Sequence, residues 1–470
     1  MKTQWIAALI MATALGVCCL GILPAAGGGR CPSANNATTM PAFAQITPHA
    51  EQAFAAGESI QAAQLAKANK KLSAQATTIK TTTNATKPKK PTKAQYRAFK
   101  RASANFSLEL FKRCVRSKSK KANVTIAPMS VMNALALTAN GAKGKTAAQM
   151  RKVLGDGALM AHMNKSLRWF NSRLTNVKKA RISSANSIWY HDDNSLIMRK
   201  KFLLRAKKYY SAEINPADFS NSETVADINN WVSEKTNSMI KKIIQQLDPT
   251  DRIAIINALY FDAQWREPYE KESVHTRTFT ASNGTKRKVK MMYSTEYKYI
   301  EGEHVRGFIK PYARGYSYVA LLPEKGLSLK KFVSTLDGDA FRKLIASAQN
   351  QTVRAGLPKY SLSYTNEGME KQLSAMGITA AFGKKANFSR MAVDKKGNLF
   401  IGSVAHKTKI DVDEQGTKAA AVTAVMARNS SAFIGPIKKV TLNRPFVYAI
   451  VDNKTKLPVF IGAVNTLGEN

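Results

Sequence analysis

The side chains that most often carry catalysis are scattered along this chain. Its six histidines are widely separated, and no pair has the i, i+4 spacing of a helical zinc site. Two of the four cysteines lie in the apolar N-terminal run, and the other two cannot form a metal cage. No Gly-x-Ser-x-Gly nucleophile elbow is present. The residue types therefore indicate no catalytic group, no metal site and no cofactor.

The segment GAKGKT, residues 141–146, resembles the end of a phosphate-binding loop. Position 139 holds alanine instead of the first glycine of that motif, and no apolar strand precedes the segment. We therefore interpret it as a turn that leads into a helix. A capping box of Thr146 and Gln149 would begin this helix, and Gly155 would end it.

The stretch from Asp411 to Phe446 is a long connection for a compact domain, which favours either a functional role or disorder. Lys418 and Arg428 share one parity, and uncharged residues of small or moderate size fill the other: Thr417, Ala419, Ala421, Thr423, Val425 and Ala427. A strand formed here would have one face fit for burial and one fit for water. A surface helix from Lys418 to Met426 and a flexible linker are the competing interpretations. The helix would lack an apolar stripe, and linkers favour Gly, Ser, Pro and charged residues.

Residues 1–26 predict a secretory signal peptide, with a basic start, an apolar run and small residues near the cleavage site. The apolar run is long enough for an uncleaved anchor, and Cys18 suggests lipidation, although Val17 is bulkier than a lipoprotein site prefers. Residues 27–93 predict a basic, low-complexity tether without stable structure. Cys31 and Cys114 are too few for a disulfide framework. We expect a secreted, extracellular or periplasmic protein, with lipid or signal-anchor tethering as a variant.

The formal net charge of +41 implies attraction to polyanions. An export signal makes acidic glycans or anionic membranes more fitting partners than nucleic acid. The basic runs at residues 87–93 and 118–121 also lack the interleaved aromatic residues of a base-stacking platform, so no specific nucleic-acid motif is found. A generally basic, solvated surface is the competing interpretation, because the lysines are dispersed.

Helical and strand-like patterns fill the rest of the chain. Apolar residues recur at helical spacing from Tyr96 to Cys114, and a short strand before Pro128 leads into a helix near Ser130. In the later part of the chain, strand-like runs occur in clusters with helical patterns segregated between them. This arrangement predicts an α+β fold in one domain over residues 94–470. The expected strands are Ile182–Tyr190, Ile253–Phe261, Tyr316–Pro323, Val353–Leu362, Arg444–Val451 and Val459–Asn465, and the expected helices include Thr224–Leu247 and Asn366–Met376.

Several segments, in order, resemble the serpin family. They are NVTIAPMSVMNALAL from Asn123, INALYFDAQWREPYE from Ile256, LPKYSLSYTNEGMEKQLSAMGITAAF from Leu357, VAHKTKIDVDEQGTKAAAVTA from Val404, and the closing LNRPFVYAIVDNKTKLPVFIGAVNTL. The resemblance covers nearly all of residues 94–470. It implies the serpin fold, with a large central β-sheet, further sheets, about nine helices and an exposed reactive loop.

The resemblance also implies a function. Serpins are suicide-substrate inhibitors of serine, and in some cases cysteine, endopeptidases, and are not enzymes themselves. The protease attacks the loop and forms an acyl-enzyme through its own nucleophile, and the cleaved loop then inserts into the large sheet. The implied partner is a target serine protease in a covalent complex with a monomeric inhibitor. The alternative is a non-inhibitory serpin that acts as a polyanion-binding or chaperone-like module.

The resemblance assigns roles to residues at three places. The inhibitory hinge is matched by Glu414, Gly416, Thr417, Ala419, Ala420, Ala421 and Thr423. The shutter and the breach, where the sheet opens, are matched by Pro128, Ser130, Asn257, His406 and Trp265. Ala127 departs from the serine usual in the shutter, which puts the hydrogen bonding there in doubt. The competing interpretations are a structural histidine at position 406 and ordinary core packing at position 265.

Family spacing from the hinge glycine places the reactive bond at Ser430–Ser431, which would suit an elastase-like or subtilisin-like pocket. The bond Arg428–Asn429 is the rival, and it would attract a trypsin-like protease. Two further candidates are Ile434 and Phe433. Counting back from the far end of the loop gives a site near Ile434, and Phe433 would suit a chymotrypsin-like pocket.

Overall fold

The computed structural model describes residues 88–174, 180–192, 195–397, 399–417 and 436–468. These residues belong to one compact unit, Lys87–Asn470. The predicted signal peptide and nearly all of the predicted tether lie outside the described residues, so both stay predictions. None of the helices in the described part is both long and apolar enough to cross a membrane.

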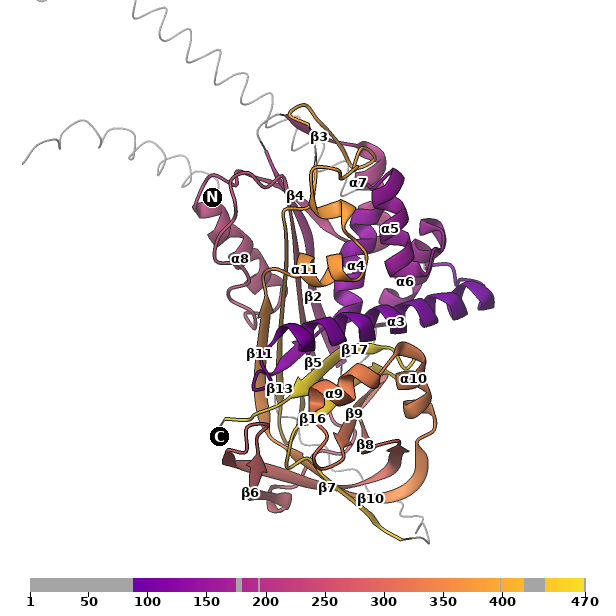
Figure 1. Cartoon of the computed structure of the whole chain (residues 1–470), viewed down its shortest axis with the longest axis vertical. Helices are drawn as coiled ribbons and strands as arrows, with labels where there is room; N and C mark the ends of the chain where they lie inside the picture. The colour runs from indigo at the N-terminus through magenta and orange to yellow at the C-terminus, as the bar shows by residue number, and fades with distance from the viewer. Residues whose placement is uncertain (1–87, 175–179, 193–194, 398, 418–435, 469–470) are drawn as a thin grey trace, which may run out of the picture. The chain divides into compact units, whose positions relative to one another are not determined.

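The described residues form nine α-helices and two 3-10 helices (Figure 1). The α-helices are α3 Lys93–Ser117, α4 Pro128–Ala139, α5 Gly144–Gly155, α6 Met160–Leu174, α7 Lys200–Tyr210, α8 Glu223–Lys235, α9 Leu329–Thr335, α10 Gly338–Ala346 and α11 Glu370–Ala375. The 3-10 helices are η1 Lys271–Ser273 and η2 Ala380–Phe382.

Seventeen strands complete the described elements. They are β1 Val124–Ile126, β2 Ala180–His191, β3 Leu196–Met198, β4 Glu213–Ala217, β5 Ile253–Gln264, β6 Val274–Thr280, β7 Lys286–Gly302, β8 Val305–Pro311, β9 Tyr316–Pro323, β10 Gln349–Pro358, β11 Tyr360–Asn366, β12 Ala392–Asp394, β13 Ser403–Val412, β14 Gly416–Thr417, β15 Lys438–Thr441, β16 Phe446–Asp452 and β17 Pro458–Val464. Most of the expected strands are therefore present, within a few residues of their predicted bounds.

The strands form three sheets. A six-stranded sheet has the order β11-β13-β14-β5-β2-β4, and β13 also pairs directly with β5. A nine-stranded sheet has the order β1-β17-β16-β9-β8-β7-β10-β15, with β6 paired to β7. The pair β12-β3 forms the third. Strands and helices are segregated along the chain, as the predicted α+β class requires.

Both faces of the six-stranded sheet are covered, which explains why β5 is buried at nearly every position. Ile256 faces a cluster that contains Ile228 of α8, whereas Ile255 and Phe261 belong to the main core. Figure 1 shows α8 and α4 on opposite sides of these strands. A strand with two covered faces has a nearly continuous apolar sequence, and IAIINALYF follows that rule.

The predicted capping box of α5 is wrong. The N-cap is Lys143, which makes no side-chain cap bond. The Thr146 hydroxyl instead accepts a bond from the Asn387 backbone N–H, and the Gln149 side chain bonds to residues Thr379 and Ala380. These polar residues hold α5 against the segment near η2, because tertiary partners compete with local capping.

Two predicted helices are shorter than expected. α8 ends at Lys235, and Asn237 and Ser238 follow with positive φ angles of 52° and 60°, which stop helical propagation. Asn366 belongs to strand β11, not to a helix, because its side chain accepts a bond from the Gly368 N–H and turns the chain before α11.

The predicted strand Val353–Leu362 is two strands in two different sheets. β10 ends at Pro358 in the nine-stranded sheet, and β11 begins at Tyr360 in the six-stranded sheet. Only Lys359 lies between them. Apolar periodicity continues through the junction, so the sequence pattern does not reveal the change of sheet.

Candidate functional site

Strands β5 and β13 form a parallel ladder in the middle of the six-stranded sheet. The ladder runs from the pair Ser403 and Ala254 to the pair Lys409 and Tyr260, and we call this ladder the seam. Beyond it the two strands separate, and β14 lies between them, antiparallel to both. Thr417 is the Cα partner of Val412 on one side and of Ala263 on the other. The seam is thus already parted at one end by the start of another strand.

Two predicted hinge residues, Gly416 and Thr417, allow β14 to fit between β5 and β13. The side chain of Thr417 is buried, and its hydroxyl lies 2.6 Å from the Tyr312 hydroxyl. A Cβ atom on Gly416 would lie 2.2 Å from the Ala263 carbonyl oxygen, which belongs to the backbone of β5. Only glycine allows the chain to approach β5 so closely.

The residues after β5 hold the turn before β14. Trp265 donates from its backbone N–H to the Gln415 carbonyl at 2.9 Å and from its indole N–H to the Asp413 carbonyl at 2.9 Å. The Tyr269 N–H donates to the Glu414 carbonyl at 2.9 Å. The Trp265 ring also stacks on Tyr312, with centroids 4.4 Å apart. The tryptophan therefore holds the turn before β14, and its role where the loop enters stays a prediction.

Glu414, the first predicted hinge residue, forms an ion pair with Lys359. The Lys359 ammonium lies 2.9 and 3.2 Å from the two carboxylate oxygens, and the side chains are 42% and 25% exposed. Burial acts to raise the pKa of Glu414, but the hydrogen bonds from Lys359, a backbone hydrogen bond and the charge of Lys359 together outweigh it and hold this pKa below its usual value. Since Lys359 joins β10 to β11, the pair links the hinge to the junction of two sheets.

A buried ion pair beside the hinge was missed by the sequence reasoning. The Lys310 ammonium lies 2.9 Å from a Glu296 carboxylate oxygen and 3.1 Å from the Glu267 carbonyl, and both charged side chains are nearly inaccessible. It also lies 4.2 Å from the Tyr269 ring centroid and 5.5 Å from that of Trp265. The available signal was a lysine within the apolar strand run GFIKPY. A buried lysine needs such a partner.

The predicted shutter residues meet behind the seam. The Ala127 N–H donates to Nε2 of His406 at 3.1 Å, so Nδ1 carries the proton of the neutral ring. Nδ1 then donates to the Asn257 side-chain oxygen at 2.7 Å, and the Asn257 amide donates to the Ser130 hydroxyl at 2.6 Å. Asn186 of β2 accepts a second bond from this amide and was not predicted. Burial lowers the pKa of His406 to about 3, so the ring is neutral at physiological pH.

The start of α4 explains why alanine is tolerated at position 127. Pro128 is the first helical residue, where its missing N–H costs nothing, and Ala127 is an N-cap without a side-chain acceptor. The Ala127 N–H finds its acceptor in His406 instead. The hydrogen bonding that the substitution put in doubt is therefore satisfied through the backbone.

The remaining predicted site residues fall within positions 418–435, outside the described residues. These are the hinge residues Ala419, Ala420, Ala421 and Thr423, and the reactive-bond candidates Arg428, Asn429, Ser430, Ser431, Phe433 and Ile434. Their assignments stay predictions.

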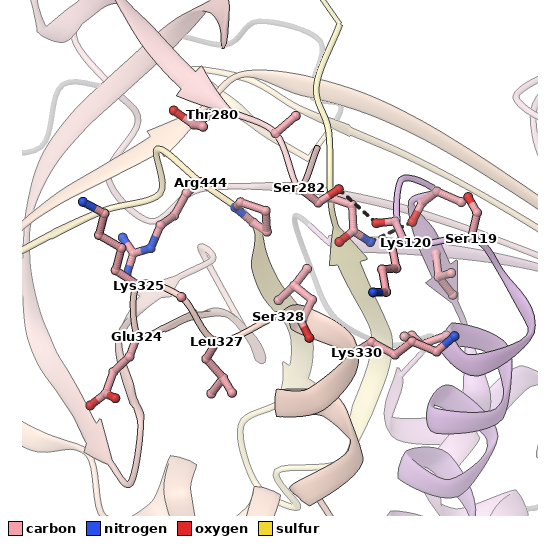
Figure 2. Close-up of a pocket in the computed structure, with 18 of the residues that line it drawn as sticks. Ser119, Lys120, Thr280, Ser282, Glu324, Lys325, Leu327, Ser328, Lys330 and Arg444 are labelled. Atoms are coloured by element: carbon pink, nitrogen blue, oxygen red, sulfur yellow. Dashed lines mark hydrogen bonds between the residues drawn. The ribbon is translucent and has the colours of Figure 1, made fainter. Parts of the chain in front are cut away.

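A cavity of about 540 Å3 lies apart from the hinge and the shutter (Figure 2). None of the predicted hinge and shutter residues that the structure describes lines it. Two of its cations hold its walls together: Lys330 donates to the Arg116 carbonyl at 3.0 Å, and Arg444 donates to the Pro323 carbonyl at 2.6 Å. Ser282 donates to the Lys120 carbonyl across the opening in Figure 2. We do not place the functional site here.

Comparison with known proteins agrees with this geometry. The family model described as serpin (serine protease inhibitor) matches residues 101–467. The chain belongs to the serpin family. An uncharacterized serpin-like protein of Thermococcus kodakarensis is 31% identical over 76% of this chain and 83% of its own length. A serine protease inhibitor of Cyanea capillata is 30% identical over 73% of this chain and 92% of its own length.

Solved serpin structures are similar over the same region. The native state of tengpin, a thermophilic serpin, is 45% identical with a TM-score of 0.75, covering 81% of this chain and 96% of its own. The latent state of tengpin is 44% identical with a TM-score of 0.70, covering 81% and 100%. The predicted family and fold are confirmed. Serpins are in general protease inhibitors.

The buried shutter histidine predicts that stability depends on pH. The pKa of His406 is about 3 in the folded chain, against 6.5 for an unperturbed histidine, so the unfolded chain binds an extra proton between these values. The contribution of His406 to the free energy of unfolding is complete above pH 6.5. It is lost as the pH falls, by at most about 1.4 kcal/mol per pH unit. We expect the free energy of unfolding, measured with urea from about pH 7 to about pH 4, to fall less steeply with decreasing pH in His406→Gln than in the unmodified chain. The exposed His162→Gln is the matched control and should keep the slope of the unmodified chain.

The Lys359–Glu414 pair predicts a charge-swap rescue. Glu414→Lys would place two ammonium groups together at the hinge and should lower the midpoint of thermal unfolding. The partly exposed pair makes the cost of order 1 kcal/mol. Adding Lys359→Glu should recover most of this loss. A double variant no more stable than Glu414→Lys alone would show that the ion pair does not hold the hinge.

Proposed function

We propose that this chain is an exported suicide-substrate inhibitor of serine endopeptidases, which traps its target as an acyl-enzyme when the cleaved loop enters the six-stranded sheet. The position of β14 is the observation that carries this proposal. Gly416 and Thr417 already occupy the first places of a strand between β13 and β5. A loop that has begun a strand there can extend it without changing direction.

The exchange of ladders supplies the driving force. The seam is one parallel ladder, and an inserted strand antiparallel to both neighbours would replace it with two antiparallel ladders. Antiparallel pairing is slightly more stable per residue, and each additional bond contributes about 1 kcal/mol net. About 14 residues inserted at roughly 3.3 Å each would carry the bound protease about 46 Å along the sheet.

The shutter would act as the latch on this movement. Asn257 lies on β5 and His406 on β13, so their hydrogen bond crosses the seam that must part. Their side chains also bond to Ala127 and Ser130 at the start of α4. Separation of β5 from β13 therefore requires these bonds to break, which keeps the uncleaved chain closed.

Export is the part of this proposal that rests on the sequence alone. The signal-like residues 1–26 support secretion or surface tethering, and the net charge of +41 supports acidic glycans as additional partners. The reactive bond proposed first is Ser430–Ser431, with Arg428–Asn429 second.

Incubation with a panel of serine endopeptidases tests the mechanism. At least one active protease should form a complex with the chain that survives boiling in SDS, and a protease without its nucleophilic serine should not. Sequencing the fragment released from the complex identifies the reactive bond. If every active protease cleaves the chain and none forms a stable complex, the proposal that the chain is an inhibitor is refuted.

A charge at the buried hinge position should convert the inhibitor into a substrate. Thr417→Arg places a guanidinium where the side chain is inaccessible, and an unpaired buried charge costs several kcal/mol. We expect cleavage at the same bond with at least a tenfold loss of covalent complex, read from the ratio of complex to cleaved chain on a gel. Gln415→Arg, at a half-buried position before Gly416, is the control and should still form complex. Full trapping by Thr417→Arg would contradict insertion at this position.

A further inference from the structure

The hairpin of β6 and β7 is basic throughout. Between Val274 and Thr295 the sequence contains no aspartate or glutamate. The same stretch contains five lysines or arginines and one histidine: His275, Arg277, Lys286, Arg287, Lys288 and Lys290. Other basic runs occur at residues 87–93, 118–121 and 199–208, and this hairpin is a further local concentration of positive charge.

Three of these lysines form a row on one face of the hairpin. Lys286, Lys288 and Lys290 are exposed, whereas Val289 and Met291 between and beside them are buried. Alternate residues of an antiparallel strand lie about 6.8 Å apart, so the row spans about 14 Å. The residues opposite them on β6 are threonines: Thr280, Thr278 and Thr276. We call this face the lysine row.

The charges of the lysine row are not used within the described fold. Lys290 donates to the Thr276 hydroxyl at 3.2 Å, and none of the three lysines forms an ion pair with a described residue. Charges that protect a sheet edge belong on the edge strand. At these positions β7 is paired to β6 alone, because its pairing with β10 begins at Met291, so the lysines also protect an open edge of the sheet.

The lysine row begins beside the hinge. The Lys359 N–H donates to the Lys290 carbonyl at 2.8 Å, and the Lys359 ammonium holds Glu414. The far flank of the loop lies further along β7, because Lys438 of β15 pairs with Val353 of β10, which pairs with Glu296 of β7, six residues from Lys290. Figure 1 shows β6, β7 and β10 together at one end of the described structure. A protein that docks beside the hinge therefore meets the Lys290 end of this row first.

We propose that the lysine row is a docking surface for an acidic patch on the target protease. This inference rests on the proposed function and adds a preference for proteases whose surface beside the active-site cleft carries carboxylates. Complementary charge at the edge of an interface raises the association rate by tenfold to a thousandfold at low salt, and its effect falls with ionic strength. The row would thus favour proteases that associate quickly with the chain. This selection would be independent of the one made by the residues at the reactive bond.

The length of the row fits a compact acidic surface. Three lysines over about 14 Å match a small cluster of carboxylates. The Lys290 end of the row also lies beside the hinge, since Lys359 contacts both Lys290 and Glu414.

The test compares two charge-reversed variants. The first carries Lys286→Glu, Lys288→Glu and Lys290→Glu. The matched control carries Lys384→Glu, Lys385→Glu and Lys395→Glu, which change net charge equally at exposed positions flanking β12. Association rates are measured for every protease that forms the covalent complex, including two trypsin isoenzymes of opposite net charge. Rates are taken at low and high salt, and thermal unfolding checks that each variant is folded.

We expect the row variant to associate at least tenfold more slowly than the unmodified chain with acidic proteases at low salt, with a smaller difference at high salt. The control variant should change by about twofold or less, and the stoichiometry of inhibition should stay the same in both. Substitution of the same three row lysines by Gln should give an intermediate rate, which also covers the case in which the Glu variant fails to fold.

Three results would overturn this inference. Equal slowing in both variants would indicate a general charge effect, and an unchanged rate in the row variant would show that proteases do not use the row. A difference that arises only after a sulfated polysaccharide is added would assign the row to glycans. If no protease in the panel is trapped, the proposed function itself fails, and this inference falls with it.

Discussion

The seam between β5 and β13 is the constraint on which the structure depends. Its ladder is closed along most of its length and parted at one end by Thr417. At the closed part, the side chains of His406 and Asn257 join across it and bond to the start of α4. One end of the seam is thus open, and side-chain hydrogen bonds bridge its middle. The surrounding core must support both, because β5 is covered on its two faces.

The fold was largely predictable because its elements have regular patterns. The apolar run of β5 and the spacing from Tyr96 to Cys114 identified a strand and an amphipathic helix. Errors arose where tertiary contacts replaced local rules. Thr146 looked like a cap residue, but it bonds to Asn387, more than two hundred positions away. The change of sheet at Lys359 has no counterpart in hydrophobic periodicity, which does not encode which strand is the neighbour.

The candidate site was predictable only in part. The residues that meet at the shutter and the hinge were named from the resemblance, since no spacing in the chain relates positions 127, 257 and 406. Asn186 and Tyr312 were missed because an asparagine or a tyrosine in a strand carries no special sequence signal. Lys310 did carry one, a charge within an apolar run, and its burial against Glu296 shows that such an exception to the pattern marks a paired charge.

The chain passes from the nine-stranded sheet to the six-stranded sheet through a single residue, Lys359. A connection of one residue has no slack, so β10 and β11 cannot shift independently. The same residue grips Glu414 through its side chain and β7 through its backbone. A displacement of Glu414 would therefore be passed through Lys359 to β7 in the neighbouring sheet.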